Sequence, residues 1–194
     1  MRTFATLLLA FALPFLVKAQ KFADLDKSPM DMAYYPSDAA FQAFGKTDEE
    51  KAARTKKIRV IYSRPMKKGR EIWGNEKMAP YGEPYRLGAN ENTEIQFFVP
   101  AMLGDQTIPA GRYTLGAIPS EDGWEVFINT DVDSWGVYAY DANKNVASMK
   151  VPVSKSEDVI EAFSITMYKA DSGMVHLKMG WDQAVVEVPF KLLD

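Results

Sequence analysis

The sequence predicts a mainly β fold: an antiparallel, jelly-roll-like β-sandwich or a flattened barrel of about eight strands, preceded by a short helical arm. From residue 57 onward apolar and polar residues alternate with a period of two, which is the period of a half-buried strand. Turn-forming residues separate these stretches at hairpin spacing. No helical crossover lies between them, which favours antiparallel pairing over a parallel sheet.

Residues 1–19 read as a signal peptide. Arg2 precedes an apolar run, and the small residues Val17 and Ala19 occupy the positions that signal peptidase reads. We therefore expect cleavage between Ala19 and Gln20. The run is too short for a comfortable transmembrane helix. The expectation is a secreted or periplasmic protein without membrane association after cleavage.

The composition argues against nucleic-acid binding and against any site that depends on cysteine. The net charge is −3, and loss of Arg2 and Lys18 with the signal peptide would make it −5. A mildly acidic chain lacks the basic face that general nucleic-acid binding requires. The absence of cysteine excludes disulfides, thiolate metal sites, cysteine nucleophiles and a lipid-bearing cysteine.

An N-terminal arm is predicted over residues 20–56, ahead of a β-sandwich domain over residues 57–194. Residues 37–38 are suited to cap a short helix that Gly45 ends. Residues 47–50 form a capping box that opens a second helix through Arg54. We expect the arm to pack against the domain as an extension; a functional lid is the alternative.

The strands are predicted from alternation and from the turns that bound them. A turn at residues 182–183 divides the last two, and Pro189 predicts an edge position for the final strand. The predicted strands cover residues 58–63, 94–99, 112–118, 124–130, 146–153, 159–168, 174–181 and 184–192.

Residues 62–93 form a connection that is long for a compact domain and rich in Arg, Lys, Gly, Pro and aromatic residues. Such a segment is functional or disordered, and its aromatic content argues against disorder. Arginine binds carboxylate, sulfate or phosphate through two parallel hydrogen bonds, and flat rings stack on sugars. The segment therefore predicts a site for a glycan or a small anionic ligand, with the candidate residues Arg64, Arg70, Trp73, Tyr85, Arg86, Asn90 and Glu91.

Two other functions remain open for this segment. Its glutamates nearly balance its cations, so Arg64 and Arg86 could instead pair with Glu91 or bond loop carbonyls and give a purely structural or assembly domain. A hydrolase acting on a glycan or an envelope polymer needs only two suitably spaced carboxyl groups. Glu91 with Asp131 or Asp133 is the pair to test.

No metal site and no cofactor are predicted. The alternating oxygens of Asn129, Asp131 and Asp133 resemble a calcium loop, but Ser134 replaces the turn glycine and Tyr140 replaces the bidentate glutamate. His176 is the single histidine and is expected at the surface. A histidine-centred triad lacks any nucleophile-elbow motif.

Several motifs resemble a secreted bacterial family, the domain of unknown function 2911. They are YSRP at 62–65, KGR at 68–70, IWG at 72–74, PYG at 80–82, RLGANENT at 86–93, IPAGRYTL at 108–115 and WG at 135–136. The resemblance covers roughly residues 57–167. Tyr85 stands where the family usually has Trp. The resemblance implies a secreted, mainly β domain and brings no reaction, cofactor or catalytic residue.

Overall fold

The computed structural model describes residues 20–193, so the predicted signal peptide at 1–19 lies outside the described residues. Ten strands pair antiparallel in two sheets. The first sheet has the order β1 (Met30–Tyr35), β2 (Ile58–Ser63), β3 (Glu94–Phe97), β6 (Gly111–Pro119), β7 (Gly123–Asn129) and β8 (Asn145–Pro152). The second has the order β5 (Gln106–Ile108), β4 (Ala101–Leu103), β10 (Val175–Leu192) and β9 (Ser154–Lys169).

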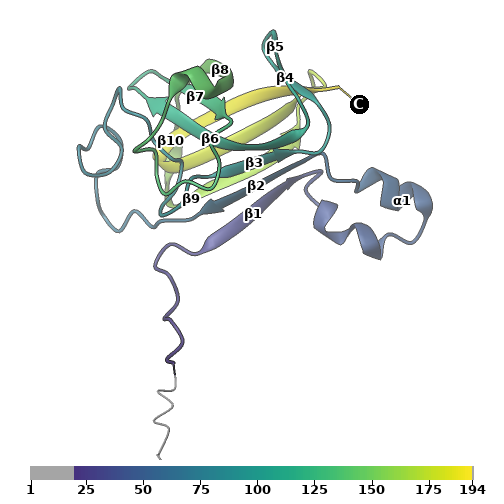
Figure 1. The fold of residues 1–194 in the computed structure, drawn as a ribbon, viewed down its shortest axis with the longest axis horizontal. Coiled ribbons are helices and arrows are strands. Elements are labelled where there is room, and N and C mark those ends of the chain that lie inside the picture. The colour runs from purple at the N-terminus through teal and green to yellow at the C-terminus, as the bar shows by residue number, and fades with distance from the viewer. Residues whose placement is uncertain (1–19, 194) are drawn as a thin grey trace, which may run out of the picture.

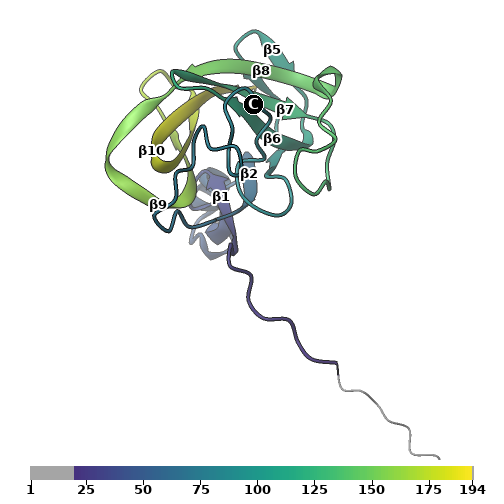
Figure 2. The same cartoon turned by 90° about the vertical axis from the view of Figure 1, so that its left-hand side faces the viewer.

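The two sheets face each other as a sandwich and do not close into a barrel (Figures 1 and 2). The predicted β-sandwich is therefore confirmed. One large apolar cluster fills the space between the sheets. Its largest side chains have almost no exposed surface: Phe97, Trp124, Phe163, Trp181 and Phe190.

Most strands lie where the alternating pattern predicted them. Three were not predicted: β1, which pairs along its whole length with β2, and the short hairpin of β4 and β5. In β1 only Ala33 is buried, so its burial pattern gives no clear period of two. The strands β4 and β5 have three residues each, too few for a periodic signal.

The last strand, β10, turns back on itself near Asp182. In an extended strand Lys178 and Glu187 would lie about 30 Å apart, yet Lys178 Nζ is 3.3 Å from Glu187 Oε1. Asp182 has a positive φ, and the pairing with β9 changes register on both sides of it. Figures 1 and 2 show the two halves of β10 side by side. The turn predicted at residues 182–183 is therefore present.

The edge position predicted from Pro189 is wrong, because β10 lies between β4 and β9. Pro189 falls between the two paired stretches of the strand. Pairing with β9 ends at Val185, and pairing with β4 begins at Phe190. A proline can therefore occupy this strand without removing a hydrogen bond of either ladder.

The helical arm follows β1 and projects away from the sandwich (Figure 1). It contains the 3-10 helix η1 (Ala39–Phe44) and α1 (Asp48–Ala53). The predicted cap is confirmed: Thr47 Oγ1 accepts a hydrogen bond from the Glu50 amide. No residue of α1 is buried. Across residues 20–193, no helix has the length and apolar character needed to span a bilayer.

Candidate functional site

The long segment between β2 and β3 is an anchored loop at one end of the sandwich. Trp73 holds its middle, because its indole Nε1 donates to the Trp181 carbonyl at 3.0 Å and its ring lies 4.3 Å from that of Trp124. Tyr85 holds its second half by exchanging two backbone hydrogen bonds with Ala117. Both aromatic residues were predicted as ligand contacts. Trp73 packs against the core, and Tyr85 is buried.

Arg64 has a structural role, because its guanidinium is hydrogen-bonded within the protein. Its Nε donates to the Phe163 carbonyl at 3.1 Å, one terminal nitrogen pairs with Asp31 at 2.8 Å, and the other reaches Ser164 Oγ at 2.8 Å. Phe163 and Ser164 belong to β9, whereas Asp31 lies on β1. The guanidinium thus ties together two strands from opposite sheets, and each of its three nitrogens already donates a hydrogen bond within the protein.

Arg70 is hydrogen-bonded to its own loop but also lines a pocket. Its Nε donates to the Lys67 carbonyl at 2.9 Å, and its terminal nitrogens reach the Met66 carbonyl and the Met78 sulfur. These bonds curl the side chain against its own loop. Its side chain nevertheless lines a pocket beside Arg86.

Arg86 is the exception among these arginines. Its guanidinium has no hydrogen bond or ion pair with any described residue, and its Nε is buried without a partner. The side chain lines a pocket of about 300 Å³. We call this the Arg86 pocket; its lining residues are Ser28, Pro65, Arg70, Lys77, Met78, Tyr85, Arg86, Gly88, Ala89, Tyr138 and Trp181.

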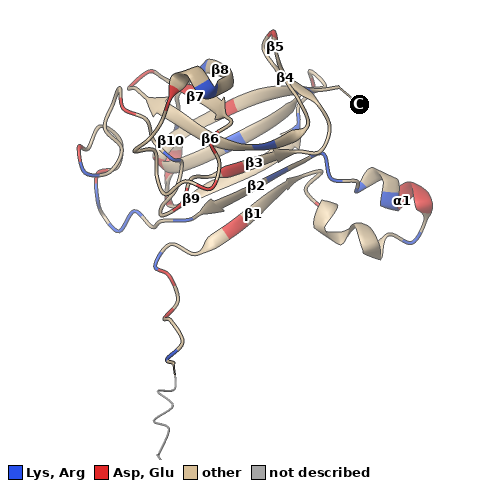
Figure 3. Ribbon diagram, in the orientation of Figure 1, with Lys and Arg blue, Asp and Glu red and all other residues tan. Residues whose placement is uncertain are grey.

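The lining of the Arg86 pocket contains three cationic side chains and no carboxylate. The glutamates that balance the segment in sequence lie elsewhere. Glu71, Glu76, Glu83 and Glu91 are exposed outside the pocket lining, and Glu94 pairs with Arg59 and Arg112. Residues of both charges lie along this loop (Figure 3), whereas the lining of the Arg86 pocket includes only its cations.

Burial raises the pKa of the Tyr85 phenol well above its ordinary value. The hydroxyl therefore stays protonated at neutral pH and donates to the Gly88 carbonyl at 3.0 Å. This bond closes the turn that forms one wall of the Arg86 pocket. The Thr93 hydroxyl closes the same turn from the other side by donating to Leu87 at 2.6 Å.

Asn90 and Glu91 occupy the tip of this turn. Asn90 has φ 62, a left-handed conformation that asparagine tolerates. Glu91 forms an isolated antiparallel bridge with Trp135. No hydrogen bond or ion pair within residues 20–193 joins Glu91 to Arg64 or Arg86, so the predicted pairing with Glu91 is wrong. Arg64 instead bonds a backbone carbonyl of β9.

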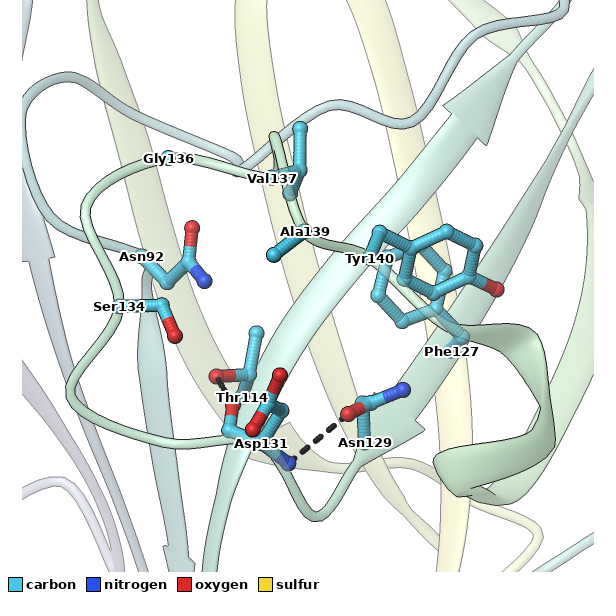
Figure 4. A pocket seen from close by; sticks show the side chains of 10 residues that line it. All are labelled: Asn92, Thr114, Phe127, Asn129, Asp131, Ser134, Gly136, Val137, Ala139 and Tyr140. Carbon is cyan, nitrogen blue, oxygen red and sulfur yellow. Dashed lines mark hydrogen bonds between the residues drawn. The ribbon is translucent and has the colours of Figure 1, made fainter.

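A second hollow lies on the other side of this turn. Its inner part is a cavity of about 20 Å³ among Asn92, Thr114, Asn129, Asp131 and Tyr140 (Figure 4). An outer cleft of about 190 Å³ contains Glu91, Glu94 and Asp133. The Asn92 side-chain oxygen is buried without a partner and belongs to the shared wall.

The oxygens of the calcium-like loop are engaged within the protein. Asn129 Oδ1 accepts from the Asp131 amide, Asp131 pairs with Lys144 at 3.2 Å, and Asp133 pairs with Arg112 at 2.6 Å. No group of metal-ligating side chains suited to an ion occurs among residues 20–193.

His176 lies on β10 and is partly buried. Its Nδ1 is 3.0 Å from Glu187 Oε2, and the Tyr168 hydroxyl donates to the same oxygen. The Tyr168 hydrogen bond is the main cause of a lowered Glu187 pKa. No serine hydroxyl joins this network among the described hydrogen bonds, so it lacks the nucleophile of a triad.

One known protein family matches most of this chain. A family model described as "Protein of unknown function (DUF2911)" matches residues 46–190. The chain belongs to the DUF2911 family. No curated protein and no solved structure gives a match. The match begins after β1, although β1 is a full member of the first sheet in this DUF2911 domain.

The family motifs serve different purposes in the DUF2911 fold. The YSRP motif fastens β2 to β9, whereas the RLGANENT motif forms the turn between the Arg86 pocket and the acidic cleft. Sequence reasoning missed Lys77 and Tyr138 as pocket residues. Lys77 lies within the segment singled out, but Tyr138 comes from a distant loop that only the fold brings there.

Proposed function

We propose that this DUF2911 domain binds a small anionic ligand, bearing a carboxylate, sulfate or phosphate group, in the Arg86 pocket. The single observation that carries the proposal is the unpartnered guanidinium of Arg86 in that pocket. A buried donor without a partner costs about 1–3 kcal/mol. An oxyanion would supply the missing acceptor and accept two parallel hydrogen bonds.

The charges around Arg86 support the same ligand class. Arg70 and Lys77 line the pocket with it, and no acidic side chain does. The Lys77 ammonium has no hydrogen bond or ion pair with a described residue. In a protein of net charge −3, such a local positive field raises the local concentration of anions.

The hydrolase alternative has weaker support. Glu91 and Asp133 do line one cleft, but Asp133 pairs with Arg112, and Asp131 faces the separate inner cavity. The purely structural alternative requires hydrogen bonds among Arg64, Arg86, Asn90 and Glu91. No described hydrogen bond joins any two of these four residues.

Isothermal titration calorimetry with sodium phosphate, sodium sulfate and sodium glucuronate tests the proposal. We expect the wild type to bind at least one of these anions. Arg86→Met, which keeps the apolar stem and removes the charged guanidinium, should abolish that binding. Lys155→Gln is the matched control, because Lys155 is an exposed cation outside the lining of the pockets described above. Equal binding by wild type and Arg86→Met, or no binding of any anion, would refute the proposal.

A further inference from the structure

The loop after β7 exposes two large aromatic side chains next to the Arg86 pocket. Tyr138 is 85% exposed and Trp135 is 64% exposed. Tyr138 lines the pocket, and Trp135 bridges to Glu91 across the neighbouring turn. Exposed aromatic surface beside a pocket is typical of a ligand or partner site.

This loop is fixed in place by several contacts. The Asn92 amide donates to the Ser134 carbonyl at 3.0 Å. At the far end, the Tyr140 ring lies 4.4 Å from that of Phe127, and its hydroxyl accepts from Asn145. The two aromatic rings are therefore presented by an anchored loop, which lowers the entropy cost of ordering them on binding.

Gly136 sets the position of the Tyr138 ring. It has φ 69, and a Cβ atom added there would lie 2.8 Å from the ring. A side chain at this position would therefore push Tyr138 away. The WG motif at 135–136 thus contains the exposed Trp135 ring and the glycine that lets the Tyr138 ring lie against the backbone.

The charge changes sign along the same surface. The pocket beside Tyr138 holds three cations, whereas the cleft beside Trp135 and its bridge partner contains Glu91, Glu94 and Asp133. Of these carboxylates, Glu91 has no ion pair with a described residue. A ligand with a negative charge on every unit would gain at the pocket and be repelled at the cleft.

We infer that the ligand is an acidic oligosaccharide with a single acidic sugar, whose carboxylate binds Arg86 while neutral sugars extend over Tyr138 toward Trp135. This inference rests on the proposed anion site. Flat aromatic faces suit the apolar faces of sugar rings. The cationic pocket accommodates one acidic group. In the cleft, Glu94 and Asp133 pair with Arg112, so Glu91 is the carboxylate that disfavours a second acidic group.

Three probes test the extension in calorimetric titrations: glucuronic acid, a xylotriose bearing one glucuronic acid, and tetragalacturonic acid. We expect the substituted xylotriose to bind about ten-fold or more tightly than glucuronic acid. Tyr138→Ala should remove most of that gain, so that the substituted xylotriose and glucuronic acid bind it with similar affinity, whereas Tyr138→Phe retains the gain. Phe44→Ala, at an aromatic residue of the arm that is 76% exposed, is the matched control.

The acidic cleft is tested by Glu91→Gln. This variant should improve binding of tetragalacturonic acid several-fold and leave the substituted xylotriose unaffected. Equal affinity of wild type for glucuronic acid and the substituted xylotriose, with a silent Tyr138→Ala, would overturn the oligosaccharide inference alone. The inference would also be overturned if tetragalacturonic acid, or a tetra-aspartate peptide as a fourth probe, bound more tightly than the substituted xylotriose. Loss of all anion binding would instead refute the underlying anion site.

Discussion

At the residue scale, two arginines of one loop have opposite roles. Arg64 spends all of its nitrogens on Asp31, Phe163 and Ser164, so it stabilises the sandwich. The guanidinium of Arg86 makes no hydrogen bond with residues 20–193, and its Nε is buried. A residue retained at a stability cost is typical of a binding site, because function and folding place different demands on it.

This contrast predicts different stabilities for two identical substitutions. Arg64→Met should lower the free energy of unfolding by roughly 2 kcal/mol, since it leaves three acceptors without their donor. Arg86→Met should change it by less than about 1 kcal/mol or raise it, because it removes an unsatisfied donor. Urea denaturation of both variants measures the difference. A large destabilisation by Arg86→Met would show that Arg86 has a structural role.

At the element scale, side-chain hydrogen bonds join β2 of the first sheet to β9 of the second. Tyr62 on β2 donates its hydroxyl to the Ile165 carbonyl at 3.3 Å and accepts from the Ile165 amide at 3.0 Å. One hydroxyl thus satisfies both backbone groups of Ile165 at the free edge of β9. This replaces the backbone pairing that a closed barrel would have at this position.

We therefore predict that Tyr62→Phe lowers the free energy of unfolding by about 2 kcal/mol, because Ile165 loses both partners inside the protein. Tyr34→Phe is the control, since the Tyr34 hydroxyl makes only a long, exposed contact with the Met32 sulfur. Hydrogen exchange should also speed up at the Ile165 amide in Tyr62→Phe and not in Tyr34→Phe. Unchanged protection at Ile165 would contradict this role for Tyr62.

Element types were predictable where the chain carries a long local signal. The tight turn at residues 120–123 revealed the hairpin of β6 and β7, and the capping box revealed α1. The strand β1 escaped because its pairing with β2, rather than its own pattern, makes it a strand. Likewise, nothing local distinguishes Arg64 from Arg86. The partners of Arg64 come from β1 and β9, whereas the guanidinium of Arg86 has none among the described residues, and only the fold determines this difference.

At the scale of the whole molecule, the buried tyrosines couple stability to alkaline pH. Burial raises the pKa values of both Tyr62 and Tyr85 above the ordinary value near 10. In the unfolded chain both phenols lose their protons near pH 10, whereas in the folded protein they keep them. The folded state then binds more protons, so stability is complete below pH 10 and falls as the pH rises further.

Tyr85 should contribute a loss of about 1.4 kcal/mol per pH unit above pH 10, and Tyr62 should add a loss in the same direction. Urea unfolding between pH 8 and 11 measures the total slope, and absorbance at 295 nm reports ionisation of the phenols. Tyr85→Phe isolates one contribution. It should be less stable than wild type at pH 8, because the bond to Gly88 is lost, yet lose stability less steeply above pH 10. Parallel slopes for the two proteins would contradict this role. They would mean that Tyr85 ionises equally in the folded and the unfolded state, although it is buried beneath the Arg86 pocket.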